Sequence, residues 1–336
     1  MNGLKIYTHK TIEGLYTKRA GETKFGEKVG FIASLDELEN SNAEYVLFGI
    51  PEDIGVRANL GKPGAANAWK TCLKSLLNVQ ANQYTNPGNL ILLGEVECSQ
   101  LMAKAANIDN EDPNYLSKLG DLVQTLDEVV SELVKRIILA EKIPIIIGGG
   151  HNNAYGNIKG TSQALKKPVN ILNIDAHTDL RKLEHRHSGN GFSYARKEQF
   201  MAKYRIFGLH QNYTPEYIFE EMIDSPKNQY RLFEHLMLLS SQEIIKAFRE
   251  ELEFVSNDDF GLELDCDAIR DFPSSAQSPS GFSFNMVRNF IKIVSEEENI
   301  RYLHICEAAP TSQIETKVGK ALSYLITDFL NPKTQG

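Results

Sequence analysis

The chain has few cysteines and no long apolar run. Its four cysteines, Cys72, Cys98, Cys266 and Cys306, form no CxxC pair, which argues against a disulfide framework or a zinc-thiolate site. Three of them lie in or beside apolar segments, so we expect buried free thiols. No apolar stretch approaches the roughly 20 residues that a membrane span needs. We therefore expect no membrane partner.

Positive charge is also in short supply. The 336 residues include 36 Lys and Arg against 44 Asp and Glu, a formal net charge of -8, without a Lys/Arg-rich run. This charge balance disfavours electrostatic binding to nucleic acid. The first residues lack the pattern of a secretory signal, so we expect a cytoplasmic protein. The 42% of hydrophobic residues suffices for an ordinary globular core.

Apolar runs typical of buried strands recur along the chain. They cover residues 45–50, 90–96, 143–147, 169–174, 204–209, 261–264 and 302–305. Segments with helical periodicity lie between them, most clearly at 116–140, 241–252 and 284–296. The alternation predicts a three-layer α/β/α fold with a central, mainly parallel sheet. Because no linker or repeat interrupts it, we predict one domain over residues 1–336, with loops near 86–88, 111–113 and 273–283.

Residues of the kinds that bind metals follow three of these predicted strands directly. They are carried by the segments GGGHNN, DAHTDLR and LELDCD, and in chain order they are His151, Asp175, His177, Asp179, Asp265 and Asp267. The carboxyl ends of parallel strands meet at one edge of a sheet, where α/β folds bind ligands. Alternate residues of extended backbone point to the same side, so we expect the carboxylates to converge.

Four converging aspartates would raise one another's pKa unless a cation neutralised them. Two imidazoles and four carboxylates exceed what one catalytic ion normally takes and suit two ions that share carboxylates. Nitrogen and oxygen donors without thiolate favour Mn²⁺, with Fe, Co or Ni as alternatives. A lone DxD or HxD is usually a turn or a helix cap. Three such motifs at three strand ends indicate two Mn²⁺ ions per chain.

The segments GGGHNNAYG, NIDAHTDLR, LELDCD and CEAAP, in this order, resemble the ureohydrolase family. This family includes arginase, agmatinase, guanidinobutyrase, proclavaminate amidino hydrolase and formimidoylglutamase. The resemblance covers most of the chain from about Phe48 onward. It implies a single arginase-like α/β/α domain that assembles as a homo-oligomer, usually a trimer or hexamer.

The resemblance also implies how the metal ligands are shared. One manganese would be held by His151, Asp175, Asp179 and Asp265, and the other by Asp175, His177, Asp265 and Asp267. Asp175, Asp265 and a water would bridge the ions, and hydroxide formed from that water would attack the C=N carbon of a linear amidine.

Two residues would take part in catalysis by the same resemblance. Glu307, in CEAAP, matches the glutamate that receives the amidino or formimidoyl nitrogens, with a capping or ion-pairing role as its alternative. Asp179, a metal ligand, would relay a proton to the leaving amine.

Three departures from the arginase pattern favour formimidoylglutamase. Where arginase and agmatinase typically read GGDH, this chain has Gly150 in place of the aspartate, as formimidoylglutamases often do. Phe192 stands where arginase carries its histidine proton shuttle, a place where formimidoylglutamases have an aromatic residue. Arg181 takes the place of an arginase asparagine that contacts the substrate carboxylate. A guanidinium there suits the two carboxylates of N-formimidoyl-L-glutamate, whereas agmatine, a dication, would fit it poorly.

The predicted substrate contacts form one group, consisting of Arg181, Ser188, Asn190, Phe192 and Arg57, the last with a surface role as an equal alternative. We assign no catalytic role to His185 or His187, because surface or hydrogen-bonding histidines are commoner. Asp271 falls one residue later than the family's xxDP sequence after DCD, which leaves the shape of that loop open.

The predicted function is manganese-dependent hydrolysis of N-formimidoyl-L-glutamate to L-glutamate and formamide, a step of histidine degradation. One alternative is an arginase, agmatinase or other guanidino-compound hydrolase that releases urea. A catalytically silent homologue with a structural or regulatory role is another, although the complete ligand set argues against it. A zinc hydrolase like the histone deacetylases is a third, disfavoured by the second DxD and Glu307.

Overall fold

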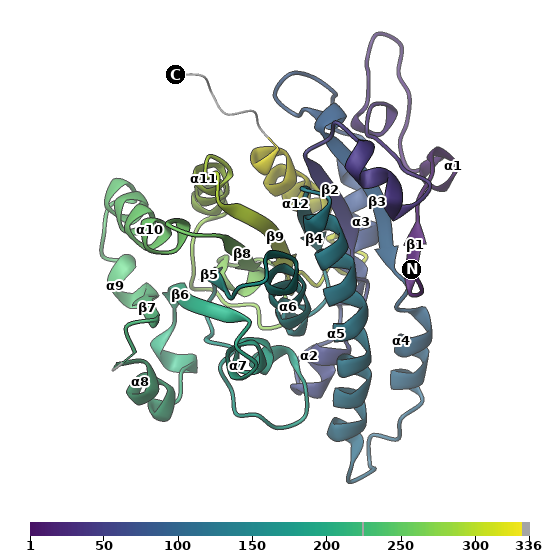
Figure 1. Cartoon of the computed structure of the whole chain (residues 1–336). Coiled ribbons are helices and arrows are strands. Elements are labelled where there is room, and N and C mark those ends of the chain that lie inside the picture. The colour runs from purple at the N-terminus through teal and green to yellow at the C-terminus, as the bar shows by residue number, and fades with distance from the viewer. Residues whose placement is uncertain (224, 331–336) are drawn as a thin grey trace.

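A computed structural model describes residues 1–330 of the chain except residue 224. One nine-stranded sheet runs through these residues in the order β1-β3-β2-β4-β9-β8-β5-β6-β7 (Figure 1). Its strands are β1 (Leu4–Ile6), β2 (Tyr45–Gly49), β3 (Leu90–Val96), β4 (Ile143–Ile147), β5 (Val169–Ile174), β6 (Met201–Leu209), β7 (Asn228–Leu232), β8 (Phe260–Asp265) and β9 (Ile300–Cys306). Every strand pairing in it is parallel except that of β1 with β3.

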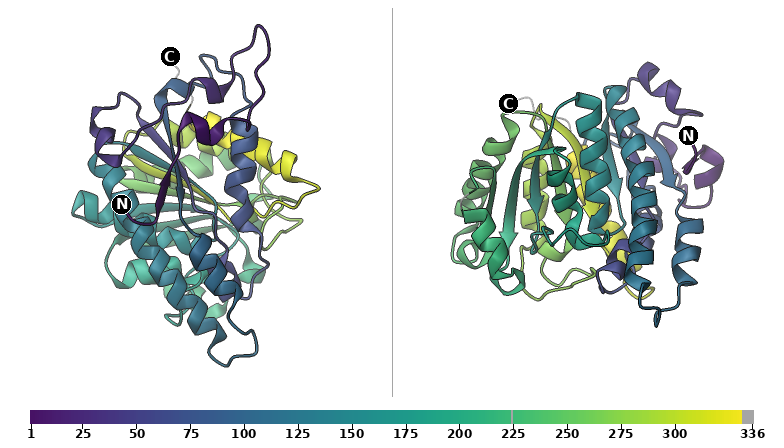
Figure 2. Two further views of the ribbon diagram at one scale, coloured as in Figure 1. Left: turned by 90° about the vertical axis from the view of Figure 1, so that its right-hand side faces the viewer. Right: turned by 60° about the horizontal axis from the view of Figure 1, so that its bottom comes forward.

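Helices cover both faces of the sheet (Figures 1 and 2). One layer contains α5 (Tyr115–Leu139), α6 (Ala154–Leu165) and α7 (Gly191–Lys197), with α4 (Ser99–Ala106) beside α5. The other contains α3 (Ala68–Leu76), α10 (Ser241–Ser256), α11 (Phe284–Ser295) and α12 (Glu315–Phe329). The shorter helices are α1 (His9–Ile12), α2 (Ile54–Ala58), α8 (Glu216–Ile223) and α9 (Phe233–Leu236).

Alternating side chains of each strand serve the two apolar cores. Ile145 and Ile147 of β4 pack in one core with Leu73 of α3, whereas Ile146 packs in the other with Val130 of α5. A strand with both faces covered needs apolar residues at every position, which is why these segments read as continuous apolar runs. The predicted three-layer α/β/α fold with a mainly parallel sheet is confirmed.

The predicted strands differ from the observed ones at the sheet edges. The bounds of β3, β4 and β5 are the predicted ones, and β2, β6, β8 and β9 differ from their predictions by up to three residues at an end. The edge strands β1 and β7 were not predicted. The side chains of β7 are alternately half-buried and exposed, and β1 has three residues, so neither gives the pattern of a buried strand.

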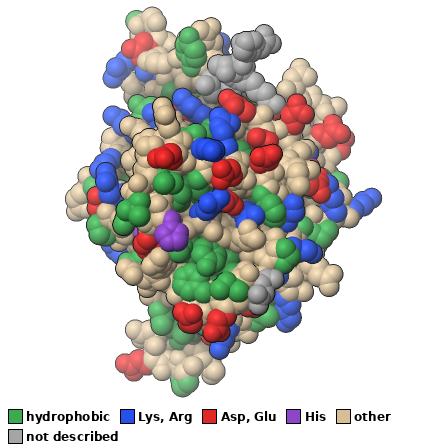
Figure 3. Space-filling model, turned by 90° about the vertical axis from the view of Figure 1, so that its left-hand side faces the viewer, with side chains coloured by type: hydrophobic (Ala, Val, Ile, Leu, Met, Phe, Trp, Pro, Cys, Tyr) green, Lys and Arg blue, Asp and Glu red, His purple; other side chains and the backbone are tan. Residues whose placement is uncertain are grey.

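The surface over α8, α9 and α10 carries acidic and basic side chains interspersed with one gathering of hydrophobic side chains (Figure 3). Ile223, Met237 and Leu238 are among the exposed large hydrophobic residues of this part of the chain. Across residues 1–330, leaving out residue 224, no helix is long and apolar enough to cross a membrane.

Candidate active site

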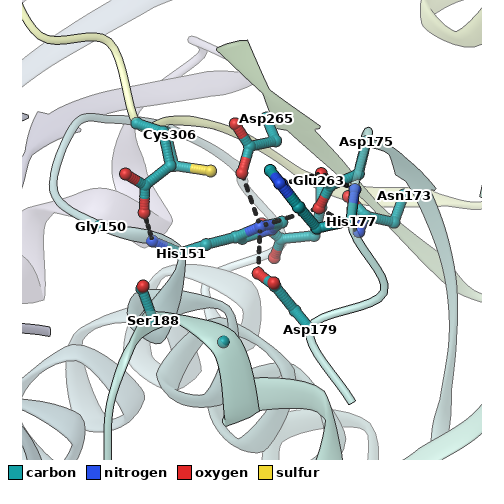
Figure 4. Close-up of polar contacts among 12 residues, drawn as sticks. Gly150, His151, Asn173, Asp175, His177, Asp179, Ser188, Glu263, Asp265 and Cys306 are labelled. Atoms are coloured by element: carbon teal, nitrogen blue, oxygen red, sulfur yellow. Dashed lines mark hydrogen bonds and ion pairs between the residues drawn. The ribbon is translucent and has the colours of Figure 1, made fainter. Parts of the chain in front are cut away.

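The predicted ligands converge at the carboxyl ends of four neighbouring strands. In the sheet β4, β9, β8 and β5 lie side by side. His151, Glu307 and the DAHTD motif follow β4, β9 and β5 respectively, and Asp265 and Asp267 lie at the end of β8. This edge is where open parallel sheets place their ligand sites. Residues more than 150 positions apart in sequence thus meet, as Figure 4 shows.

Three carboxylates surround one nitrogen of His151. The Nδ1 atom lies 2.9 Å from Asp179 Oδ2, 3.1 Å from Asp265 Oδ2 and 3.3 Å from Asp175 Oδ2. The His151 and Asp175 side chains are buried, and that of Asp179 is 12% exposed. These four residues are the ones predicted to share the first metal ion, and their ligand atoms lie within 4.8 Å of one another.

The second predicted ligand group is more open. His177 Nδ1 lies 3.5 Å from Asp175 Oδ1 and 3.9 Å from Asp267 Oδ2. Asp267 is held from the other side by the backbone N–H of Ala276, which donates to Oδ1 at 3.0 Å. His177 is about a quarter exposed and lines a cavity, so this group faces the solvent side of the site.

The sequence led us to expect that extended backbone would make the carboxylates converge. In the structure, tight turns bring them together instead. The strands end at Ile174 and Asp265, and the motifs continue as tight turns. The N–H of His177 donates to Asp175 Oδ1 at 2.7 Å, and the N–H of Asp267 donates to Asp265 Oδ1 at 2.7 Å. Each of these two aspartates uses one oxygen to close a turn and presents the other to His151.

The cluster fits a bound cation. His151 Nδ1 is buried and has no hydrogen-bond partner among the described residues, although carboxylate oxygens surround it. Ligand atoms about 2.1 Å from a common ion lie about 3 Å apart, which is the spacing seen here. Burial and the neighbouring Asp267 raise the pKa of Asp265 well above its usual range, and burial also raises that of Asp179. A cation in the cluster would favour the ionised carboxylates.

The triple glycine brings His151 into the cluster. Gly149 has φ +74°, and a Cβ atom there would lie 2.3 Å from Asn153 Nδ2. At Gly150 a Cβ atom would lie 2.6 Å from Asn152 Oδ1 and 3.2 Å from Glu307 Oε1. The loop has no room for a side chain at Gly150, which gives a structural reason for GGGH in place of GGDH.

Glu307 points into the site from a strained backbone. Its φ of 61° is in the left-handed region, a conformation that costs a non-glycine residue about 1–3 kcal/mol. Oε1 accepts the backbone N–H of His151 at 2.6 Å, and Oε2 is buried without a partner in the part of the chain that the structure describes. Burial and Asp267 raise its pKa to about 8. The free oxygen is available to a polar group in the cavity.

A cavity of about 520 Å³ opens over the cluster. Carboxylates and His177 line its floor, and Arg181 lines it with its side chain half-exposed. Arg181 Nη1 donates to Asn59 Oδ1 at 2.5 Å, and Asn59 Nδ2 donates to Ser188 Oγ at 3.1 Å. Arg181 and Ser188, two of the predicted substrate contacts, thus line the cavity and are joined by Asn59, which the sequence analysis did not single out.

Three predicted substrate contacts do not line this cavity. Asn190 is buried, accepting from Arg186 and the His187 N–H and donating to the carbonyl of His185. Phe192 is fully buried, with its ring edge-on to that of His151 at 5.1 Å. Arg57 lies beside Asp53, 3.8 Å from Nε to Oδ1. Asn190 and Phe192 therefore support the site from behind.

His185, His187 and Asp271 also lie outside the cavity lining. His185 Nε2 faces the carbonyl of Ala58 at 3.0 Å, and His187 Nδ1 accepts the N–H of Gly189 at 3.1 Å. The loop after Asp267 returns to the site through Ser275 and Ala276, whereas Asp271 is exposed.

Sequence reasoning missed the buried polar residues behind the ligands. Glu52 accepts the N–H groups of Ile54 and Gly150 and the side-chain amide of Asn153, so it fixes the glycine loop. Glu263 and His304 are fully buried within β8 and β9. The signal that could have found them was an ionisable residue flanked by apolar ones in a predicted strand, as in LEL of β8 and LHI of β9. All four cysteines are free and buried, which confirms that prediction.

The comparison with protein families decides the class. The model of the arginase family matches residues 43–330. The chain belongs to the arginase family. The predicted arginase-like fold is that of a member of this family.

Several curated proteins similar to this chain carry the name formimidoylglutamase. The chain is 26% identical over 246 residues to that of Macrococcus caseolyticus, covering 72% of this chain and 73% of that protein. It is 29% identical over 276 residues to that of a Geobacillus species, covering 79% of this chain and 76% of that protein.

Solved structures share the fold over nearly the whole chain. A formimidoylglutamase from Bacillus subtilis superposes with a TM-score of 0.73 at 17% identity, covering 94% of this chain and 92% of that one. A formiminoglutamase from Trypanosoma cruzi, solved with Mn²⁺, has a TM-score of 0.72 at 15% identity, covering 92% and 98%.

Replacing His177 with alanine tests the second ligand group. We expect His177→Ala to lower occupancy of one metal site and activity together, because His177 faces Asp175 and Asp267 but not His151. Metal content after dialysis and turnover are the measurements. Full activity in this variant would show that the assignment of two ions is wrong, and His185→Ala serves as a control histidine outside the cavity.

Proposed function

We propose that this arginase-family chain hydrolyses N-formimidoyl-L-glutamate to L-glutamate and formamide. The observation that carries the proposal is the charge pattern of the cavity. Its floor is acidic, with Asp179, Asp265 and Glu307, and Arg181 is the one Lys or Arg in its lining among the described residues. A ligand with an amidine at one end and carboxylates at the other fits this pattern.

The relatives support this substrate. Curated proteins that the chain matches over most of its length carry the name formimidoylglutamase. Solved structures with the same fold carry the names formimidoylglutamase and formiminoglutamase. The Trypanosoma cruzi structure with Mn²⁺ supports manganese as the metal. The predicted location in the cytoplasm, the single domain and the trimeric or hexameric assembly remain predictions.

Each residue of the cluster has a proposed part. His151, Asp175, Asp179 and Asp265 would hold one Mn²⁺, and Asp175, His177, Asp265 and Asp267 would hold the other, as the two ligand groups suggest. Two such ions supply Lewis acidity and lower the pKa of a shared water. The chain contributes the fixed positions of these ligands.

Glu307 and Asp179 act on the substrate itself. The unpartnered Oε2 of Glu307 can accept an N–H of the formimidoyl group, and its Oε1 stays bonded to the His151 N–H. The oxygen of water joins the formimidoyl carbon, the bond from that carbon to the glutamate nitrogen breaks, and a proton must reach the departing nitrogen. Asp179 lines the cavity and is placed to carry that proton.

Guanidino hydrolysis is the second candidate, because the acidic floor would also receive a guanidinium. Arg181 argues against agmatine, which has no carboxylate for it. Arginine and guanidinobutyrate each have a carboxylate, so the products decide between them and N-formimidoyl-L-glutamate. A zinc deacetylase or a silent homologue explains fewer of the residues, because neither needs the second group around His177 together with Glu307.

The proposal is tested by the products of Mn²⁺-loaded protein. We expect L-glutamate and formamide in equal amounts from N-formimidoyl-L-glutamate, and neither product from protein dialysed against a chelator. Metal-loaded protein that releases no glutamate would overturn the proposed substrate. Equal glutamate release from the stripped protein would overturn the metal requirement.

Replacing Arg181 tests the substrate's anionic end. Arg181→Ala is expected to raise KM roughly 10- to 100-fold, because a hydrogen bond to a charged group contributes about 1.5–3 kcal/mol. The value of kcat should change less, since the contact is made equally in ground and transition states. Lys182→Ala is the matched control, because this neighbouring cation is exposed and lies outside the cavity lining. If both variants had the same KM as the unchanged protein, Arg181 would not be a substrate contact.

A further inference from the structure

A second carboxylate lies behind His151, on the side away from the aspartates. The Nε2 atom of His151 is buried and makes no hydrogen bond of good geometry to any described residue. Its acidic neighbour is Glu263, with Oε2 at 3.4 Å, and the Glu263 side chain has no solvent exposure. The His151 ring therefore has the metal-ligand aspartates on its Nδ1 side and Glu263 on its Nε2 side (Figure 4).

The position of Glu263 is fixed by residues of the next strand. Glu263 in β8 pairs in register with His304 in β9, whose Nδ1 lies 2.5 Å from Glu263 Oε2. The hydroxyl of Tyr302 donates to Glu263 Oε1 at 2.8 Å. The second ring nitrogen of His304 faces the carbonyl of Gly148 at 3.3 Å. The carboxylate is thus tied to the glycine loop that carries His151.

A buried glutamate at this place carries a desolvation cost that an apolar residue would not. Burying a carboxylate in an apolar core carries a penalty of several kcal/mol that only good hydrogen bonds offset. The strand Phe260–Asp265 is otherwise apolar before Asp265, and an apolar side chain would fill the same space. A metal-binding imidazole needs its remote nitrogen protonated, and a carboxylate there fixes that tautomer and the ring orientation.

We propose that Glu263, held by His304 and Tyr302, is a positioning residue that orients His151 for metal binding. Because His151 belongs to one ligand group and not to the other, Glu263 governs the affinity of one metal site. This inference rests on the proposed metal centre and is independent of which amidine is the substrate.

The test is manganese binding by Glu263→Gln, which keeps the side-chain volume and removes the charge. Manganese titration of the dialysed protein should show one of the two sites weakened roughly 10- to 100-fold, as for other residues that orient metal-ligating histidines. Electron paramagnetic resonance at limiting metal should show isolated Mn²⁺ in place of a coupled pair. Excess Mn²⁺ should restore much of the activity with the KM for substrate unchanged.

The matched control is Asp328→Asn, because Asp328 of α12 is a buried carboxylate that pairs with Arg288 of α11, outside the metal cluster. It should lower thermal stability without changing manganese affinity. Two ions bound with unchanged affinity by folded Glu263→Gln would overturn the inference. If Glu263→Gln does not fold, Glu263→Asp takes its place, because the shorter side chain keeps the charge but moves it away from His151. Unchanged manganese affinity in this variant would likewise overturn the inference. Failure of the unchanged protein to bind two ions would instead count against the metal centre.

Discussion

Replacing Asp265 with alanine is expected to remove both metal ions and to lower kcat by at least on the order of 10³-fold, since each metal supplies several kcal/mol of transition-state stabilisation. Asp265 belongs to both proposed ligand groups. Its Oδ2 lies 3.1 Å from His151 Nδ1, and its Oδ1 accepts the N–H that positions Asp267. No other substitution in the cluster except that of Asp175 disturbs both groups directly.

Metal content and turnover of Asp265→Ala are to be measured together, beside Asp271→Ala as control. Asp271 is an exposed aspartate of the same loop and does not line the cavity, so its replacement should leave both quantities unchanged. If the Asp265→Ala protein kept two manganese ions, the assignment of Asp265 as a ligand of both ions would be wrong. Loss of activity in both variants would indicate damage to the loop and not to the metal centre.

Glu307→Gln should keep both metal ions and lose on the order of 10²- to 10⁴-fold in kcat/KM, because leaving a buried cationic group without its carboxylate costs about 3–5 kcal/mol. The amide keeps an oxygen for the His151 N–H, so the loop that carries His151 should not move. What is lost is the carboxyl group whose unpartnered Oε2 would bind the substrate's nitrogens. Bound metal ions and a cationic substrate would favour its ionised form despite its raised pKa.

Manganese content separates this role from a structural one. If Glu307 only capped the loop, Glu307→Gln would retain activity, since the capping oxygen is still present. If the variant lost its metal as well as its activity, the residue would act through the ligands and not on the substrate. The expected pattern of full metal content with low turnover fits neither alternative.

The sequence predicted the central strands well because each is buried on both faces. A run such as Ile143–Ile147 has no polar face, so its length and composition alone mark a strand of a covered parallel sheet. The edge strands β1 and β7 were missed because each has a neighbouring strand on one side only and is more open to solvent than the central strands. The local sequence pattern does not indicate which strand each of them pairs with.

The convergence of the proposed metal ligands was predictable because ligand-type residues stood at strand ends. The sequence did not predict which strands are neighbours, namely β4, β9, β8 and β5, because strand order is set by packing of the whole sheet. The mode of convergence was also wrong in detail, because the turns at Asp175 and Asp265, and not extended backbone, aim the carboxylates. Local hydrogen bonds of Asx turns outweigh the strand geometry there.

The residues behind the ligands show where sequence reasoning stops. Glu52 fixes a loop about 100 positions away, and Glu263 reaches His151 across more than 100. Phe192 aligned with a substrate-facing position yet stacks on Tyr204 inside the core, 4.6 Å between ring centroids. Such contacts depend on side-chain packing between distant segments, which a single sequence does not encode in any local pattern.

The central claim is tested most directly by one comparison of kcat/KM for Mn²⁺-loaded protein on N-formimidoyl-L-glutamate, arginine, agmatine and guanidinobutyrate. We predict turnover of N-formimidoyl-L-glutamate, detected as glutamate, far above urea release from the three guanidines. Urea release from any guanidine at a higher kcat/KM would contradict the substrate while keeping the family, and absence of turnover on all four would contradict the proposed activity.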